Sequence, residues 1–215
     1  MNLVQALYLN HAEKPFDDVR VRQALCYAVD KQQILEMAFD GYGSLIGSSM
    51  YPAFGKYFDE SLVDYYEYDV EKAKALLAEA GYPNGEGFPV VEYLYNTADN
   101  HKAIGEYLQA AYAGVGLNMQ LVNQEWNTFL NTRKNGDYAV ARNGWLADYN
   151  DPICFLDMWT TGSGNNDVQF GKGAHADLAI YDLDLTSFGY DVKVEDGTWA
   201  ETYDVLIGII KTCTD

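Results

Sequence analysis

The residues with the clearest capacity for ligand chemistry lie together between positions 142 and 152. This stretch reads Arg-Asn-Gly-Trp-Leu-Ala-Asp-Tyr-Asn-Asp-Pro and offers one arginine, two aromatic rings and two carboxylates. A carboxylate such as Asp148 can hold an ammonium group, and a guanidinium such as Arg142 can hold a carboxylate with two parallel hydrogen bonds. An amino acid or a peptide carries both partner charges. Taken without further context, the stretch is equally typical of a polar turn with a structural role.

Strand geometry limits which of these side chains can reach one ligand. The stretch starts at the carboxyl end of an expected strand over residues 138–145, which is where open α/β sheets bind ligands. Side chains alternate between the two faces of a strand, so Arg142 and Trp145 are expected on opposite faces. Both can face one ligand only if the chain turns at Gly144 or leaves the sheet there.

The elements around this stretch predict an α/β domain. Strands and helices alternate over the centre of the chain, at 90–96, 101–114, 118–123, 125–134 and 138–145. This order indicates parallel strands joined by crossover helices. An opening strand at 3–10 comes first, and Asp17 or Asp18, Asp30 and Asp69 are expected to cap the three helices that follow it.

Charge and hydropathy exclude several classes of partner. The 215 residues include 32 acidic and 14 basic ones, for a net charge of −18. Such a chain repels nucleic acid phosphates and anionic membrane surfaces, so neither is an expected partner. No stretch reaches the roughly 18 apolar residues of a membrane span, and the first residues do not read as a signal peptide. Taken literally this predicts a cytosolic protein, whereas for an excised piece of a longer chain it predicts nothing.

The residue types that bind metals or form disulfides are sparse, so no cofactor is expected. The cysteines are three, an odd number, and lie far apart at Cys26, Cys154 and Cys213, which indicates neither a zinc site nor a disulfide framework. Cys26 is expected in the core. A cluster of acids towards the C-terminus is a candidate for calcium, but it lacks the twelve-residue binding loop. Its members are Asp182, Asp184, Asp191, Glu195 and Asp196.

An enzyme is the rival interpretation of the carboxylates. Asp148 and Asp151 could act as a hydrolytic pair. The sequence has no G-x-S-x-G, H-E-x-x-H or phosphate-loop motif. His11, His101 and His175 are isolated from one another and are expected on the surface. We therefore predict that the chain is not an enzyme.

Several separate segments resemble one protein family. They are Pro-Phe-Asp-Asp-Val-Arg-Val-Arg-Gln-Ala-Leu from position 15, Ala-Leu-Leu-Ala-Glu-Ala-Gly-Tyr from 75, Gly-Val-Gly-Leu from 114, Arg-Lys-Asn-Gly-Asp-Tyr from 133, and the Gly-Trp to Asp-Pro run of 144–152. In order and spacing the chain resembles the second lobe of the oligopeptide- and dipeptide-binding class of extracellular solute-binding proteins. The resemblance covers residues 1–170 well and residues 200–215 loosely.

The resemblance implies a fold, a function and partners. The fold is a periplasmic-binding-protein-like (type II) α/β lobe with a mixed, mainly parallel sheet flanked by helices. The chain, residues 1–215, is then one ligand-binding lobe, with 171–199 as a possible insertion and the first lobe of the parent chain missing. The implied role is to capture peptides outside the membrane, at the cell surface or in the periplasm, and to deliver them to the permease of an ABC importer. Other members of the family bind nickel chelates, haem or sugars, and these ligands stay open as alternatives.

The resemblance also implies roles for single residues. Asp148 holds the ammonium group of the peptide, and Trp145 lies beside the peptide backbone. Arg142 and Arg133 neutralise the peptide carboxylate. For Arg133 an exposed cation at a helix end is an equal alternative. Asp151 is expected to cap a short helix rather than to touch a ligand.

Overall fold

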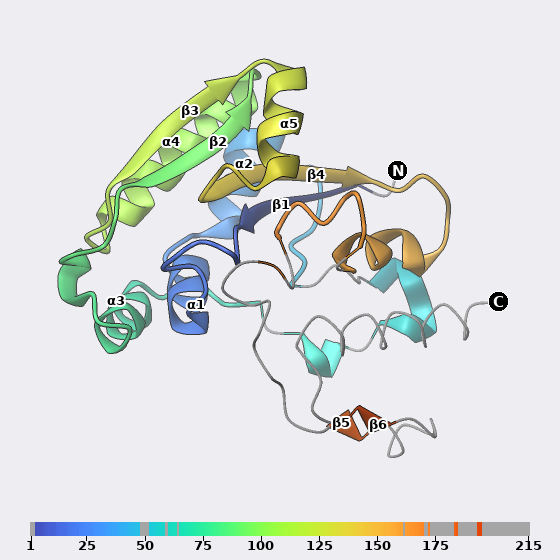
Figure 1. The fold of residues 1–215 in the computed structure, drawn as a ribbon, viewed down its shortest axis with the longest axis horizontal. Helices are drawn as coiled ribbons and strands as arrows, with labels where there is room; N and C mark the ends of the chain where they lie inside the picture. The colour runs from blue at the N-terminus through green and yellow to red at the C-terminus, as the bar shows by residue number, and fades with distance from the viewer. Residues whose placement is uncertain are drawn as a thin grey trace.

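Four strands form the central sheet of the computed structural model, in the order β1-β4-β2-β3 (Figure 1). They are β1 (Leu3–Leu9), β2 (Val91–Asn96), β3 (Met119–Gln124) and β4 (Val140–Leu146). Strand β2 runs parallel to both β3 and β4, and β1 pairs antiparallel with β4 at the edge. The expected mixed, mainly parallel sheet is confirmed.

The structure describes residues 3–47, 52–58, 60–63, 65–160, 162–169 and 172, together with the backbone of 183–184 and 193–194. The last two segments pair as β5 (Leu183–Asp184) and β6 (Lys193–Val194). The predicted insertion at 171–199 and the loosely similar segment at 200–215 therefore lie almost entirely outside the described residues. So do His175 and the side chains of the five acids considered for calcium.

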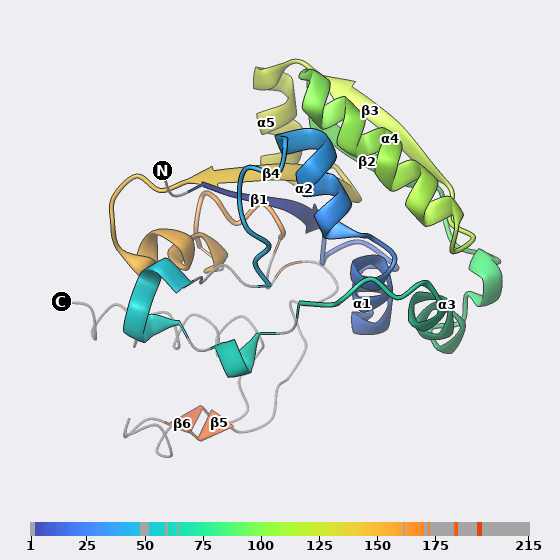
Figure 2. The same ribbon diagram turned by 180° about the vertical axis from the view of Figure 1, so that it is seen from behind.

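Helices cover both faces of the sheet. Figure 2 shows α4 (Asp99–Ala113) over β2 and β3, and α2 (Lys31–Phe39) over the other half of the same face. Helix α5 (Trp126–Asn135) covers the opposite face. Because both faces are covered, β2 is buried at four of its six residues, as expected for a strand in a parallel sheet.

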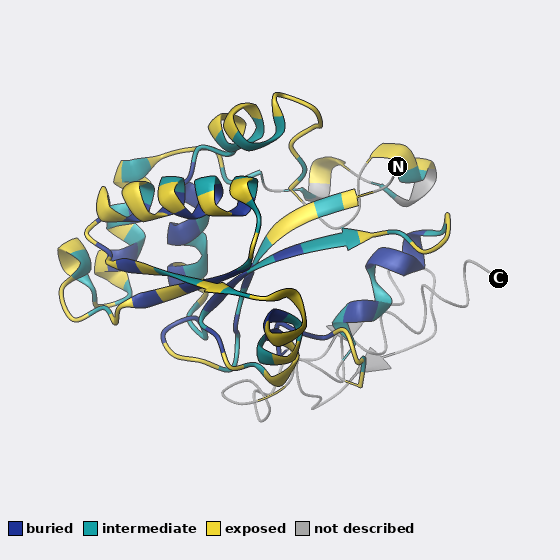
Figure 3. Ribbon diagram, turned by 90° about the horizontal axis from the view of Figure 1, so that it is seen from above, coloured by how far each residue is buried: buried dark blue, intermediate teal, exposed yellow. Residues whose placement is uncertain are grey.

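Two apolar clusters correspond to the two faces. The larger joins α1 (Val19–Tyr27), α3 (Val70–Glu79) and α4 to the sheet, with Tyr93 and Leu108 among its fully buried members. The smaller lies under α5 and contains Tyr8, Leu94 and Phe129. Buried residues are concentrated in β2, in the first half of β4 and on the inner sides of α1, α3, α4 and α5, whereas β1 and the outer sides of the helices are largely exposed (Figure 3).

Aspartate caps begin the first three helices, as predicted. The side chains of Asp18, Asp30 and Asp69 accept hydrogen bonds from the backbone N–H groups two or three residues further on. Asp151 caps η4 (Pro152–Phe155) in the same way, with 2.9 Å from its Oδ1 to the nitrogen of Ile153. The capping role expected for Asp151 is confirmed.

Some local expectations are wrong. His101, expected on the surface, is only 8% exposed because it begins α4 against the end of β2. Cys26, expected in the core, is only half-buried. The expected loop over 44–68 contains two short 3₁₀ helices, η1 (Pro52–Tyr57) and η2 (Glu60–Leu62). In the part of the chain that the structure describes, none of the helices is long and apolar enough to cross a membrane.

Candidate functional site

The carboxyl ends of β2 and β4 separate and leave part of β4 unpaired. The two strands pair only at Tyr93–Val140 and Leu94–Ala141, although β4 continues to Leu146. Figure 1 shows their carboxyl ends pointing in different directions. The order of strand addition also reverses here, since β3 lies on one side of β2 and the next strand, β4, lies on the other. Such a topological switch point is where open α/β sheets bind ligands.

Along the split, every second residue of β4 turns its backbone N–H and carbonyl groups towards the β2 side. The Ala139 carbonyl accepts a hydrogen bond of 3.0 Å from the N–H of Asn10, on the β1 side. Backbone groups alternate in direction along a strand, so those of Arg142, Gly144 and Leu146 point away from β1. Beyond Ala141 no described strand pairs with β4 on that side. The N–H and carbonyl groups of Gly144 and Leu146 therefore form an open strand edge, here called the β4 edge.

Polar side chains gather where the split begins. The Arg142 guanidinium donates to Asn96 Oδ1 at 3.3 Å across the split and to Gln5 Oε1 at 3.1 Å on β1. An added Cβ on Gly144 would lie 2.7 Å from Nη2 of Arg142, so glycine there leaves room for this arrangement. Behind it, Nδ1 of His101 lies 3.1 Å from the Asn96 carbonyl oxygen and must carry the proton, because a carbonyl only accepts.

One hydrogen-bond donor of this polar cluster, in the Arg142 guanidinium, is buried without an acceptor among the described residues. This donor is the Nε–H group of Arg142. Burial, and next the charge of Arg133, lowers the pKa of Arg142. Burial also lowers the pKa of His101, which keeps its imidazole neutral near pH 7. A carboxylate arriving beside the half-buried guanidinium would offset part of the cost of burying its charge.

Arg133 lies inside the protein, so the alternative of an exposed cation is wrong. Its Nε is 2.6 Å from Oδ2 of Asp167, and the two side chains are 10% and 5% exposed. The guanidinium also lies over the Phe129 ring, 5.0 Å from its centre. Burial raises the pKa of Asp167, and the adjacent guanidinium opposes that rise. A peptide carboxylate would have to compete with Asp167 for Arg133.

The loop after β4 is held by Cys154 of η4. Trp145 donates from Nε1 to the Cys154 carbonyl at 2.7 Å, and the Asp148 N–H lies 3.3 Å from the Cys154 sulfur. The Asp148 side chain is exposed, and no described residue hydrogen-bonds to its carboxylate. It is therefore accessible to an incoming ammonium group.

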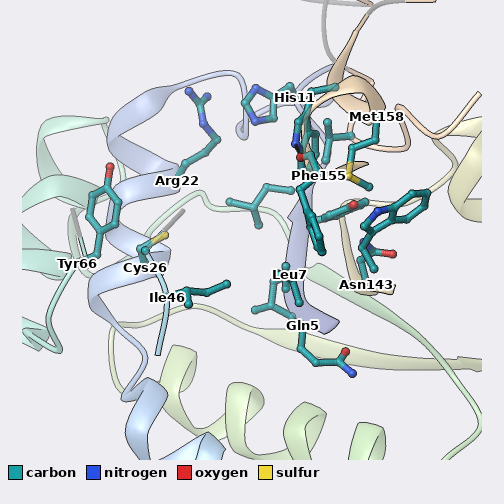
Figure 4. A pocket seen from close by; sticks show the side chains of 18 of the residues that line it. Gln5, Leu7, His11, Arg22, Cys26, Ile46, Tyr66, Asn143, Phe155 and Met158 are labelled. Carbon is teal, nitrogen blue, oxygen red and sulfur yellow. Dashed lines mark hydrogen bonds between the residues drawn. The ribbon is translucent and has the colours of Figure 1, made fainter. Parts of the chain in front are cut away.

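A cavity of about 570 Å³ lies along the outer side of β1. Figure 4 shows Arg22 and Cys26 of α1 on one side of it and Phe155 and Met158 on the other. Of the four predicted ligand residues, only Trp145 lines it. The cavity is mostly apolar and shares Gln5 with the polar cluster at the split. Arg142, Arg133 and Asp148 do not line it, so the arrangement of these charged groups favours the split as the ligand site.

The structure thus brings together only part of the predicted set. Strand β4 runs straight through Gly144, so Arg142 and Trp145 lie on opposite faces. Asn96 and His101, which join Arg142 at the split, were not predicted as site residues. The signal that could have indicated Asn96 is its position at the end of an expected parallel strand, next to the strand that carries Arg142.

Comparison with known proteins identifies the family of the chain. The family model for bacterial extracellular solute-binding proteins, family 5, matches residues 2–167. The chain is 39% identical to the dipeptide-binding protein of Escherichia coli, over 70% of this chain and 28% of that protein. It is 37% identical to heme-binding protein A of Haemophilus influenzae, over 77% of this chain and 30% of that protein.

Solved structures show the same similarity. A periplasmic oligopeptide-binding protein from Borrelia burgdorferi is 37% identical with a TM-score of 0.69, over 80% of this chain and 34% of that one. The periplasmic binding protein DppA of Helicobacter pylori, solved with a peptide, is 28% identical with a TM-score of 0.71, over 78% of this chain and 33% of that one. The chain spans about a third of the length of these relatives. It belongs to the bacterial extracellular solute-binding proteins of family 5.

Proposed function

We propose that the chain is one lobe of a binding protein that captures peptides outside the membrane and delivers them to the permease of an ABC importer. The observation that carries this proposal is the β4 edge. Its unpaired backbone groups suit an extended peptide, which can add to a sheet edge as a further strand. Main-chain pairing of this kind accepts varied side chains. The relatives named as peptide-binding proteins support the same ligand class.

The charged groups give the peptide a direction. Asp148 follows the end of β4 and is proposed to hold the ammonium group, and Arg142 at the start of the split is proposed to hold the carboxylate. The peptide then runs antiparallel to β4. Trp145 lies on the far face of β4, where it lines the cavity beside β1, so its predicted place beside the peptide backbone stays a prediction.

A second lobe is proposed to close over this edge. The matched part of the chain covers 28% and 34% of two of these relatives, and domain closure around a ligand is a common mechanism in binding proteins. The part of the parent protein outside this chain would supply that lobe, in the periplasm or at the cell surface. Binding and release, rather than catalysis, is the proposed role. A single lobe is therefore expected to bind peptides weakly, and calorimetry giving sub-micromolar affinity for this chain would contradict the one-lobe view.

The ammonium contact is tested by comparing trialanine with N-acetyl-trialanine in NMR titrations of the 215-residue chain. Because Asp148 is exposed, we expect the free amine to bind only about 2- to 5-fold more tightly. Asp148→Asn should abolish this difference, and Asp151→Asn, which changes a helix cap, should retain it. A D148N chain that still prefers the free amine would refute the assignment.

Haem is the second candidate, because a haem-binding relative is as similar as the peptide-binding ones and the cavity beside β1 is mostly apolar. Titration with haemin, followed by its absorbance, separates the two. Under the peptide proposal, trialanine perturbs the amides of the β4 edge and haemin does not. Saturable haemin binding that shifts cavity residues instead would favour haem.

A further inference from the structure

The split between β2 and β4 starts at a backbone carbonyl group of β4 that accepts a hydrogen bond from a side chain instead of from β2. The next β4 backbone group to face β2 beyond the paired residues is the carbonyl of Arg142. Continued pairing would offer this oxygen to a backbone N–H of β2. Instead it accepts a hydrogen bond of 3.2 Å from Nη1 of Arg133. A guanidinium thus takes the place of the neighbouring strand.

Asp167 fixes that guanidinium from behind. Its carboxylate binds Nε of Arg133 at 2.6 Å, which leaves Nη1 turned to the Arg142 carbonyl. Arginine can do this because its donors form a rigid planar fork, whereas lysine presents a single point charge. Packing against Phe129 restricts the fork further.

The segment that carries Asp167 is itself anchored to the sheet. The Asp167 carbonyl accepts a hydrogen bond of 2.6 Å from the Tyr138 hydroxyl, just before β4. The next residue, Val168, accepts from the N–H of His11, just after β1, at 3.2 Å. These two hydrogen bonds fix Asp167 relative to β1 and β4, and Asp167 in turn fixes the Arg133 guanidinium.

We propose that Arg133 and Asp167 are positioning residues that end the β2–β4 pairing and hold the β4 edge open for its ligand. This proposal rests on the proposed function and assigns to Arg133 an internal role in place of the predicted contact with a peptide carboxylate. Arg133 acts on the ligand through the Arg142 carbonyl, and Asp167 acts through Arg133.

The hydrogen bond itself is tested without any ligand. In the ¹³C,¹⁵N-labelled 215-residue chain, the carbonyl ¹³C shift of Arg142 reports on this bond. Arg133→Lys keeps the charge opposite Asp167 but loses the fork, so we expect this shift to move while the carbonyl shifts of β3 stay unchanged. Lys134→Met, which removes the exposed neighbouring cation, is the matched control and should move neither. An unchanged Arg142 carbonyl shift in folded R133K would overturn the proposal.

The consequence for binding is tested with trialanine and its C-terminal amide. We expect R133K to weaken both peptides by about tenfold, because the edge that pairs with their backbone is displaced. A much larger loss for the free acid than for the amide would show that Arg133 contacts the carboxylate, which overturns the proposal. If the wild-type chain binds neither peptide, the proposed function fails, and the carbonyl shift still decides whether Arg133 positions β4.

A folding defect is controlled with a second variant. Losing one partner of a buried ion pair leaves the other charge uncompensated, so the double change Arg133→Met with Asp167→Asn removes both charges at once. We expect this variant to fold, to lose the Arg142 carbonyl signature and to bind both peptides about tenfold more weakly. Wild-type affinity in the folded double variant would contradict the positioning role.

Discussion

Two turns of backbone meet at Gly116, and this contact makes a sharp prediction about stability. Gly116 has φ +87°, in the left-handed region, and an added Cβ would overlap the carbonyl oxygen of Asn84. Gly81, which ends α3, has φ +98° but no atom within 4 Å of an added Cβ. Gly114 ends α4 with φ −63°, and an added Cβ there would lie 3.1 Å from the Ala111 carbonyl oxygen of the same helix, a close contact but no overlap. Alanine at Gly81 therefore tests the left-handed backbone alone, alanine at Gly116 adds steric overlap to it, and alanine at Gly114 has neither.

The expected magnitudes follow from these differences. Gly114→Ala should be nearly neutral or stabilise by up to about 1 kcal/mol, because alanine restricts the unfolded chain. Gly81→Ala should cost about 1–2 kcal/mol for the left-handed backbone alone. Gly116→Ala adds an overlap with rigid backbone, for a total of about 3 kcal/mol or more. At about 2–4 °C per kcal/mol for a chain of this size, G116A should melt at least about 6 °C below wild type.

Thermal unfolding followed by circular dichroism at 222 nm, with urea titrations alongside, measures the series. The order of stability should be G114A, then G81A, then G116A as the least stable. G116A as stable as G81A would refute the claim that the turns at Asn84 and Gly116 are in contact.

Two further predictions concern a helix cap and a buried histidine. Asp69→Ala removes the acceptor 2.9 Å from the N–H of Lys72 and should cost about 1 kcal/mol, whereas Glu71→Ala on the same turn should cost less than half of that in the same urea titrations. Burial lowers the pKa of His101, so near pH 6 the unfolded chain binds more protons than the folded one. The free energy of unfolding should therefore fall as the pH drops through about 6.5, and His101→Gln should reduce that slope. A slope unchanged in H101Q would show that other groups cause it.

The sequence predicted those features that depend on neighbours along the chain. The caps at Asp30 and Asp69 follow from a side chain and an N–H three residues apart. The strand–helix alternation from 90 to 146 follows from local periodicity. Side-chain alternation placed Arg142 and Trp145 on opposite faces, and β4 keeps that geometry through Leu146.

The features that the sequence did not predict join distant segments. Asp167 lies 34 residues beyond Arg133, and nothing in the local pattern of either indicates a buried ion pair. His101 is buried because α4 starts against the end of β2, which depends on how the helix packs. The length of the β2–β4 pairing is likewise a tertiary property, and it decides which part of β4 is open.

The central claim is that an extended peptide pairs with the β4 edge. Amide chemical shifts and hydrogen exchange in the ¹⁵N-labelled chain, measured with and without trialanine, test it residue by residue. The account predicts shifts and slower exchange for the N–H groups of Gly144 and Leu146, which face the split, and little change for those of Asn143 and Trp145, which face β1. Equal changes at all four residues, or changes confined to the cavity beside β1, would contradict it.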